Sequence, residues 1–356
     1  MNKSQINIIG CVGVPNKYGG FEALAENLAK SKKFISFIYC SGKAYPGQER
    51  LSTFHNAQLH YVNLKANGFS SMLYDAVCIL HSVQRNQKNL LCLGVSGAWI
   101  YPFIRIFFRD VKIITNVDGV EWRRKKFGLL SKIVLKNLHR IAERYSTKII
   151  CDNQALLFFV RKKYRKKVEI ISYGGDQVLD HWNSEKILEH QDYSLAICRI
   201  VPENNVEMIL RAFCLTGEKL VFVGNWQHSV YARTIFEKYS DISNISLMNE
   251  VYDIAFLSAL RKNAKFYVHG HSAGGTNPSL VEALFLCKAI LYFDCDFNRN
   301  TLKNQGFPFK GVDDLCQLTR RSPKDQSDQY LNVAFANYAW EIICEKYYKC
   351  FSLKDK

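Results

Sequence analysis

The chain has 356 residues, of which 48% are hydrophobic and 13% aromatic, and it carries a formal net charge of +16. This length exceeds what one ordinary hydrophobic core supports, so two domains are expected, and the apolar content excludes a disordered chain. No apolar run reaches the ~20 residues of a membrane-spanning helix. The first residues, MNKSQINIIGCVG, resemble a β-strand and a turn rather than a signal peptide, so we expect a soluble intracellular protein.

The positive charge is concentrated in the first half. Residues 1–175 contain 28 Lys and Arg against 10 Asp and Glu, with clusters at Arg123–Lys126 and Arg161–Lys167. Such one-sided charge suits an anionic partner (lipid headgroups, nucleic acid or a phosphorylated substrate). A solvated helix face explains each cluster alone equally well, but the location of both clusters in one half favours the anionic partner. The twelve cysteines include no Cys-x-x-Cys pair, which favours buried free thiols over disulfides or zinc ligands.

Along the first half, short apolar runs alternate with amphipathic stretches. Helices are expected at 21–31 and 71–87, and strands at 6–14, 34–40, 59–64, 89–95, 112–119, 148–153 and 168–174. Continuous apolar strands separated by helices are typical of a parallel sheet that is covered on both faces. After a polar segment at 176–192 the alternation resumes and continues to residue 293.

This pattern predicts an α/β protein made of two Rossmann-like, doubly wound domains that face each other across a cleft. We expect an N-terminal domain at 1–175, a second domain at 176–330, and a C-terminal helix at 331–356 that packs back toward the N-terminal domain. Ligands of such folds bind at the carboxyl ends of the strands, so the loops that follow strands are the candidate functional loops.

Two such loops lie in the first half. Gly19 and Gly20 precede a helix, where backbone N–H groups can approach a phosphate closely; a tight turn with a cap explains these glycines equally well. Pro15 and the length of this loop exclude a dinucleotide-binding fingerprint. Asp118 and Glu121 follow a strand, and a carboxylate there is suited to orient or deprotonate an acceptor hydroxyl, unless these residues only form a turn and neutralise nearby arginines.

Two further loops lie in the second half. Arg199 follows a strand and is suited to clamp a diphosphate, or else is a surface arginine. In the segment from His269 to Leu284, Asn277 is a helix cap, Pro278 occupies the first helical position, and Glu282 is placed to accept hydrogen bonds from ligand hydroxyls. The Asp-x-Asp sequence at Asp294 and Asp296 looks like a metal motif, but two turn aspartates are the better interpretation.

Together these motifs resemble the retaining glycosyltransferases of family 4, which have the GT-B fold. The similarity is to a bacterial, rhamnosyltransferase-like branch, and it rests on four ordered blocks that extend over nearly the whole chain: Pro15 to Glu22, Asp118 to Trp122, Pro202 to Asn204 and His269 to Ala283.

The resemblance implies a role for each matched position. Arg199 would neutralise the diphosphate, and Glu282 would hold the nucleotide ribose. Asp118 and Glu121, because of their position after a strand, are the other candidate catalytic residues beside Arg199. Two positions depart from the broader family: Gly274 stands where a first glutamate contacts the donor sugar, and Asn204 replaces a lysine that assists Arg199. The donor-binding residues would be Gly19, Gly20, Arg199, His271, Gly275, Thr276, Asn277 and Glu282.

The resemblance also implies the substrates and the location. The donor would be a nucleotide sugar, with dTDP-rhamnose as the first choice and a UDP-hexose or UDP-N-acetylhexosamine as the alternative, and no metal or other cofactor is expected. The acceptor would be a polyprenyl-diphosphate-linked glycan of surface polysaccharide. The protein would lie on the cytoplasmic face of the plasma membrane, bound to anionic lipid through residues 98–109 or through the basic clusters. A buried helix is the competing interpretation of residues 98–109.

Two other classes of protein explain fewer of the motifs. A nucleotide-sugar epimerase or dehydrogenase needs the dinucleotide fingerprint that the first loop lacks. A nucleic-acid-binding protein would account for the basic first half and leave the motifs of the second half unexplained. No nucleic-acid partner is therefore expected.

Overall fold

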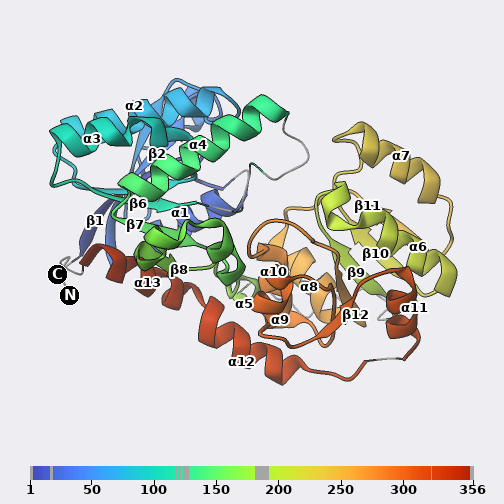
Figure 1. The fold of residues 1–356 in the computed structure, drawn as a ribbon. Helices are drawn as coiled ribbons and strands as arrows, with labels where there is room; N and C mark the ends of the chain where they lie inside the picture. Colours follow the sequence, from blue (N-terminus) through green and yellow to red (C-terminus); the bar gives the residue numbers. More distant parts are fainter. Residues whose placement is uncertain are drawn as a thin grey trace. The chain divides into compact units, whose positions relative to one another are not determined.

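The protein forms two compact units in a computed structural model, which describes residues 3–16, 19–117, 119, 122, 128–180, 192–321 and 323–352 (Figure 1). Unit 1 comprises Met1–Tyr173 and Trp340–Lys356, and unit 2 comprises Gly174–Ala339. The chain therefore passes from unit 1 to unit 2 within two residues of position 175, where the sequence suggested a boundary.

Unit 1 is built on an eight-stranded sheet with the order β3-β4-β2-β1-β5-β6-β7-β8. All neighbouring strands pair in parallel except β3 and β4. The central strands are rich in Ile, Leu and Val and are buried on both faces, as a covered parallel sheet requires. The strands are β1 (Ser4–Ile9), β2 (Phe34–Ser41), β3 (Thr53–Phe54), β4 (Ala57–Val62), β5 (Asn89–Leu93), β6 (Lys112–Asn116), β7 (Lys148–Cys151) and β8 (Val168–Ile170).

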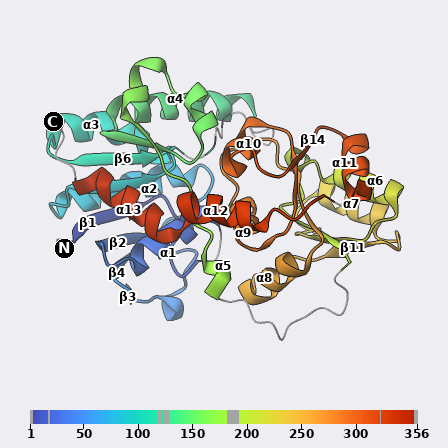
Figure 2. The ribbon, with the colours of Figure 1, turned by 90° about the horizontal axis from the view of Figure 1, so that it is seen from below.

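Two groups of helices cover this sheet (Figures 1 and 2). On one face, α1 (Gly20–Lys30) packs with α13 (Trp340–Ser352) over β1 and β2, in one core cluster. On the other face, α2 (Ser70–Gln84), the short helix η2 (Ser96–Ile100), α3 (Tyr101–Phe107) and α4 (Leu129–Tyr145) contact one another. Unit 1 also contains η1 (Gly47–Glu49), η4 (Gln154–Phe159) and η5 (Lys162–Lys167).

A buried carboxyl group lies under η2. Asp75 of α2 accepts a hydrogen bond from the backbone of Gly97, its Oδ1 has no partner in the part of the chain that the structure describes, and burial raises its pKa from 3.8 to about 8. Between about pH 4 and pH 8, Asp75 therefore stays protonated in the folded protein but is ionised in the unfolded chain. Stability should fall as the pH rises from about 4 to about 8, because deprotonation is easier in the unfolded chain.

Replacing Asp75 by asparagine should remove this dependence, since the amide does not titrate. The variant is expected to be more stable than the wild type at pH 8 and to differ little from it at pH 4. Urea unfolding at the two pH values measures both quantities. Equal stability of the two proteins at pH 8 would show that Asp75 is not held in its neutral form.

Unit 2 has a six-stranded parallel sheet with the order β11-β10-β9-β12-β13-β14. Its strands are β9 (Ser194–Ile197), β10 (Leu220–Val223), β11 (Ile245–Met248), β12 (Phe266–His269), β13 (Ile290–Phe293) and β14 (Phe307–Phe309). Its helices are α5 (Gln177–Asp180), η6 (Pro202–Asn204), α6 (Val206–Thr216), α7 (Val230–Tyr239), α8 (Ile254–Asn263), α9 (Pro278–Leu286), α10 (Asp296–Leu302), α11 (Val312–Arg321) and α12 (Ser327–Tyr338). Two core clusters fill the spaces on the two sides of this sheet.

The predicted fold class is confirmed: both units are doubly wound α/β domains with a mostly parallel sheet. At the end of the chain, where the sequence suggested a single helix, the structure has two. The first, α12, lies in unit 2 against α9, and the second, α13, lies in unit 1 against α1. All twelve cysteines are free thiols, and most are buried. None of the helices in the described ranges is both long and apolar enough to cross a bilayer.

Candidate functional site

The strand order of unit 2 reverses between β9 and β12, which pair side by side. The connections that follow β9 and β12 pack on opposite sides of the sheet, and ligands of such folds bind at the carboxyl ends of the strands where the order reverses. The loop after β9 carries Arg199, and the loop after β12 carries the segment from Gly270 to Asn277. The topology therefore brings two of the four sequence motifs to one place.

Direct hydrogen bonds join these two loops. Asn204, a buried residue of η6, donates from Nδ2 to the carbonyl oxygen of Arg199 at 2.7 Å, and its Oδ1 lies 2.8 Å from Nδ1 of His271. The backbone N–H of Ser272 donates to the carbonyl oxygen of Glu203 at 2.9 Å. The side chain of Arg199 is exposed and makes no hydrogen bond or ion pair with the described part of the chain.

Asn204 also determines the tautomer of His271. Because its amide nitrogen donates to a carbonyl, its Oδ1 faces the imidazole, and Nδ1 of His271 must carry the hydrogen. The Nε2 atom of His271 then faces Gly274, where an added Cβ would lie 2.9 Å away. Gly274 has a φ of +137°, a conformation that other residues rarely adopt. A glutamate at this position would be strained, which explains why glycine stands where the broader family has glutamate.

Gly270 is required by the closeness of the two loops. A Cβ on this residue would lie 2.2 Å from the carbonyl oxygen of Asn204 and 2.8 Å from the Ile209 side chain. Replacing Gly270 by alanine should push the loops apart and lower the free energy of unfolding by about 1–3 kcal/mol. Urea unfolding measures the loss. Gly311, whose Cβ would meet nothing within 4 Å, is the matched control, and an equal effect of G311A would contradict the explanation.

His269 at the end of β12 is a fully enclosed imidazole. It is 2% exposed, stacks on Tyr267 with the ring centroids 6.0 Å apart, and has no partner for Nε2 among the described residues. Burial and the neighbouring His271 hold its pKa well below the usual range, so the ring is neutral at physiological pH. His269 therefore places an uncharged imidazole ring next to that of His271.

The start of α9 confirms the predicted cap. Asn277 accepts a hydrogen bond from the backbone N–H of Ser279 at 2.9 Å, and Pro278 is the first helical residue. The next two N–H groups donate to the carbonyl oxygen of Asn277. Because Pro278 has no N–H, the first turn of α9 retains no free donor. Any anion contact must use the residues before the helix, namely Gly274 to Asn277.

Glu282 is held by a buried arginine. Its carboxylate accepts hydrogen bonds from Arg261 at 2.5 Å and from Gln177 at 2.9 Å. Arg261, on α8, is only 2% exposed and also donates to Ser279 at 3.1 Å. Its Nε has no partner among the residues that the structure describes. Glu282 is therefore part of a charged network under the start of α9, and only its outer side is available to a ligand.

The structure describes some of the candidate residues of unit 1 and not others. Gly19 is exposed and precedes α1, and a Cβ on Gly20 would lie 3.3 Å from the Tyr173 ring. The neighbouring Glu22 is buried and accepts a hydrogen bond from the Val12 N–H at 2.7 Å, so it holds the loop after β1. Asp118, Glu121 and the cluster Arg123–Lys126 lie outside the described residues.

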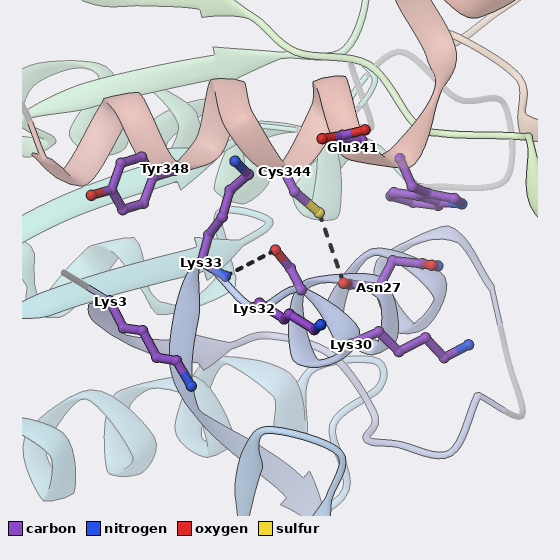
Figure 3. Close-up of a pocket in the computed structure, with 10 residues that line it drawn as sticks. Lys3, Asn27, Lys30, Lys32, Lys33, Glu341, Cys344 and Tyr348 are labelled. Atoms are coloured by element: carbon purple, nitrogen blue, oxygen red, sulfur yellow. Dashed lines mark hydrogen bonds between the residues drawn. The ribbon is translucent and has the colours of Figure 1, made fainter. Parts of the chain in front are cut away.

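A separate cavity of about 450 Å³ lies between α1 and α13 in unit 1 (Figure 3). It is close to the amino ends of β1 and β2, whereas Gly19 and Gly20 follow the carboxyl end of β1. None of the candidate site residues that the structure describes lines it. Its lining is basic and aromatic, with Lys3, Asn27, Lys30, Ser31, Lys32, Lys33, Trp340, Glu341, Cys344 and Tyr348.

The aspartates of the Asp-x-Asp sequence have protein partners. Asp294 accepts a hydrogen bond from Arg299 at 2.6 Å, and the same arginine lies 3.5 Å from Asp296. Arg299 holds the pKa of Asp294 below its usual range. These carboxylates are thus ion-pair residues at the start of α10.

Comparisons with known proteins establish the fold. A family model described as "Domain of unknown function (DUF1972)" matches residues 3–176, and comparison with the curated proteins finds no match. Sucrose-phosphate synthase from Thermosynechococcus elongatus has a similar structure, with a TM-score of 0.79, 11% identity and 98% of each chain covered.

Two further solved structures are similar over the same range. They are Anabaena HepE in complex with UDP-glucose (TM-score 0.72, 11% identity, 99% of this chain and 100% of that chain) and the catalytic domain of starch synthase IV from Arabidopsis thaliana bound to ADP and acarbose (0.71, 12%, 99% and 99%). At these identities the similarity shows the fold, and the fold is of the GT-B class.

Sequence reasoning missed the partners of the site residues. Neither Arg261 nor Gln177 was predicted as a site residue, because an arginine in the last turn of a helix is common and does not by itself indicate a buried ion pair. Asn204 was noted only as a departure, whereas the structure makes it the link between Arg199 and His271.

Proposed function

We propose that this protein is a retaining glycosyltransferase that uses a nucleotide-sugar donor. The observation that carries the proposal is the joining of the Arg199 and His271 loops by Asn204 at the strand-order reversal of unit 2. In a GT-B chain, these hydrogen bonds hold the loop that carries the exposed Arg199 side chain against the glycine-rich loop after β12, at the end of the sheet where ligands of such folds bind. The solved structures with UDP-glucose and with ADP support a nucleotide ligand.

Each site residue has a chemical task in this proposal. Arg199 neutralises the charge that develops on the leaving diphosphate, and Gly275, Thr276 and Asn277 bind the donor sugar and phosphate. The outer side of Glu282 accepts hydrogen bonds from the ribose, and Arg261 fixes the carboxylate in position. His271, whose Nδ1 is held by Asn204, is a further proposed contact of the donor.

The transfer itself needs no enzymatic nucleophile. The acceptor hydroxyl attacks the anomeric carbon from the face that the diphosphate leaves, and a diphosphate oxygen takes the hydroxyl proton. The anomeric configuration is therefore retained, and catalysis depends on positioning and anion stabilisation. In unit 1, Gly19 and Gly20 remain proposed contacts of the diphosphate, and Asp118 and Glu121 remain proposed residues that orient the acceptor.

The donor we favour is dTDP-rhamnose, and the acceptor we favour is a polyprenyl-diphosphate-linked glycan of O-antigen or capsule synthesis, reached from the cytoplasmic face of the membrane. The motifs of residues 15–22 and 269–283 support this choice. A UDP-hexose is the second candidate donor, because HepE binds UDP-glucose.

A thermal-shift screen with dTDP-, UDP- and GDP-sugars tests the donor class. The account expects one nucleotide class to raise the Tm by several degrees at saturating concentration, since a ligand stabilises the state that it binds. Stabilisation by RNA or DNA, with no shift from any nucleotide sugar, would overturn the proposal in favour of a nucleic-acid-binding protein.

A further inference from the structure

We propose that the outer surface of α2, η2, α3 and α4 in unit 1 docks this protein on an anionic lipid bilayer. We call this surface the α2–α4 face. The inference rests on the proposed function, because it supplies the route by which a lipid-linked acceptor reaches the enzyme. The proposal states which helices and which side chains contact the bilayer.

The first observation is a row of exposed apolar side chains on η2 and α3. Phe103, Ile106 and Phe107 are 57%, 62% and 71% exposed, and Trp99 precedes them by one helical turn. Spacings of three and four residues place them on one side of the segment. The opposite side is filled by Tyr101 and Ile104, which are buried. This segment is thus apolar toward the core and also apolar toward solvent.

The neighbouring helices continue the surface. Helix α4 begins with Leu129 and Leu130, which are 77% and 73% exposed, and Ile133 follows one turn later. Helix α2 exposes Leu73 and Leu80, seven residues apart and therefore on one side of the helix. Contacts between α2 and η2, between η2 and α4 and between α3 and α4 make these helices one layer.

The second observation concerns the charges of the same helices. Helices α2, α3 and α4 contain only two acidic residues, Asp75 and Glu143, and both are buried. Glu143 is paired with Arg161 and lies 3.5 Å from His139. The exposed ionisable side chains of α4 are all cationic, namely Lys136, Arg140 and Arg144. The α2–α4 face therefore offers cations and apolar groups without an exposed carboxylate.

The opposite face of the sheet has a different composition. The exposed large hydrophobic residues include none from the described parts of α1 and α13. Lysines there stand among carboxylates: Lys30 pairs with Glu26 at 3.1 Å, and Lys33 pairs with Glu345 at 2.7 Å. Among the described helices of unit 1, strongly exposed apolar side chains without exposed carboxylates therefore occur on the α2–α4 face and not on α1 and α13.

A bilayer fits this combination better than a nucleic acid does. Apolar side chains gain free energy when they enter the boundary between headgroups and acyl chains, and lysine or arginine gains from anionic headgroups nearby. A nucleic-acid backbone would use the cations and leave the phenylalanines and leucines in water. In this proposal, residues 98–109 act together with the cationic side chains of α4.

Flotation with lipid vesicles tests the docking surface. The wild-type protein is expected to bind vesicles of phosphatidylcholine mixed with phosphatidylglycerol and to bind pure phosphatidylcholine weakly. The double variant F103S/F107S should lose about tenfold in binding to the mixed vesicles, because two inserted aromatic groups are removed. The double variant K136E/R140E should lose the preference for phosphatidylglycerol. Tyr252→Ser, at a residue of unit 2 that is 77% exposed, is the matched control and should bind normally.

Two results would overturn the proposal. One is binding of F103S/F107S and K136E/R140E to mixed vesicles with wild-type affinity, and the other is failure of the wild type to bind them at all. Circular dichroism melts establish that each variant is folded. The donor-induced thermal shift should be unchanged in both variants, so a failed docking surface and a failed donor site give different results.

Discussion

Replacing Glu282 by alanine is expected to lower the free energy of unfolding by about 3 kcal/mol, even without a ligand. The reason is Arg261, which is 2% exposed and donates to the Glu282 carboxylate at 2.5 Å. Removal of the carboxylate leaves a buried positive charge without its counter-ion, which is among the most costly single changes. Urea unfolding of the two proteins measures the difference.

The double variant R261M/E282Q separates the ion pair from the rest of the site. It removes both charges and keeps a side chain of similar length at each position, so it should recover much of the stability that E282A loses. If E282A is as stable as the wild type, Arg261 does not depend on Glu282. The result matters for function, because loss of donor binding in E282A alone would not distinguish a ribose contact from a weakened fold.

Replacing Arg199 by alanine should weaken donor binding without lowering the stability of the free protein. The dissociation constant of the nucleotide sugar is expected to rise about 30-fold, since a charge-assisted hydrogen-bonded contact with the diphosphate is lost. Stability without ligand should not change, because the Arg199 side chain is exposed and no described residue pairs with it. Isothermal titration calorimetry with the donor found in the thermal-shift screen measures the first quantity, and thermal unfolding measures the second.

Arg211 provides the matched control for this prediction. It is an exposed arginine in the same unit, on α6, away from the loops that follow the strands. R211A should bind the donor as the wild type does. Equal weakening by R199A and R211A would mean that the general positive field, rather than a specific clamp, attracts the ligand.

The layered architecture could be predicted from the sequence because its signals are local. Runs such as residues 34–40 and 89–95 are continuous in apolar residues, and the helix at 206–216 has the amphipathic period, so each element carries its own evidence. The cap at the start of α9 was predicted for the same reason, since Asn277 and Pro278 act on their immediate neighbours.

The short elements β3 and β14 were not predicted. Each has two or three residues and depends on pairing with a partner strand, which a local pattern does not reveal.

The contacts of the site were less predictable because they join distant positions. Arg261 meets Glu282 across 21 residues, and Gln177 meets it across 105. Asn204 and His271 lie 67 residues apart and become neighbours only because β9 pairs with β12. The strict need for glycine at Gly270 likewise arises from the backbone of Asn204.

The measurement that tests the central claim most directly is sugar transfer. The purified protein is incubated with a nucleotide sugar and a polyprenyl-diphosphate glycan, and the product is examined by mass spectrometry and by the anomeric couplings of its NMR spectrum. The account predicts a glycan enlarged by one sugar, with the anomeric configuration of the donor retained, and strongly reduced transfer by R199A. A product of inverted configuration would contradict it. Epimerisation or oxidation of the nucleotide sugar, with no sugar transferred, would also contradict it.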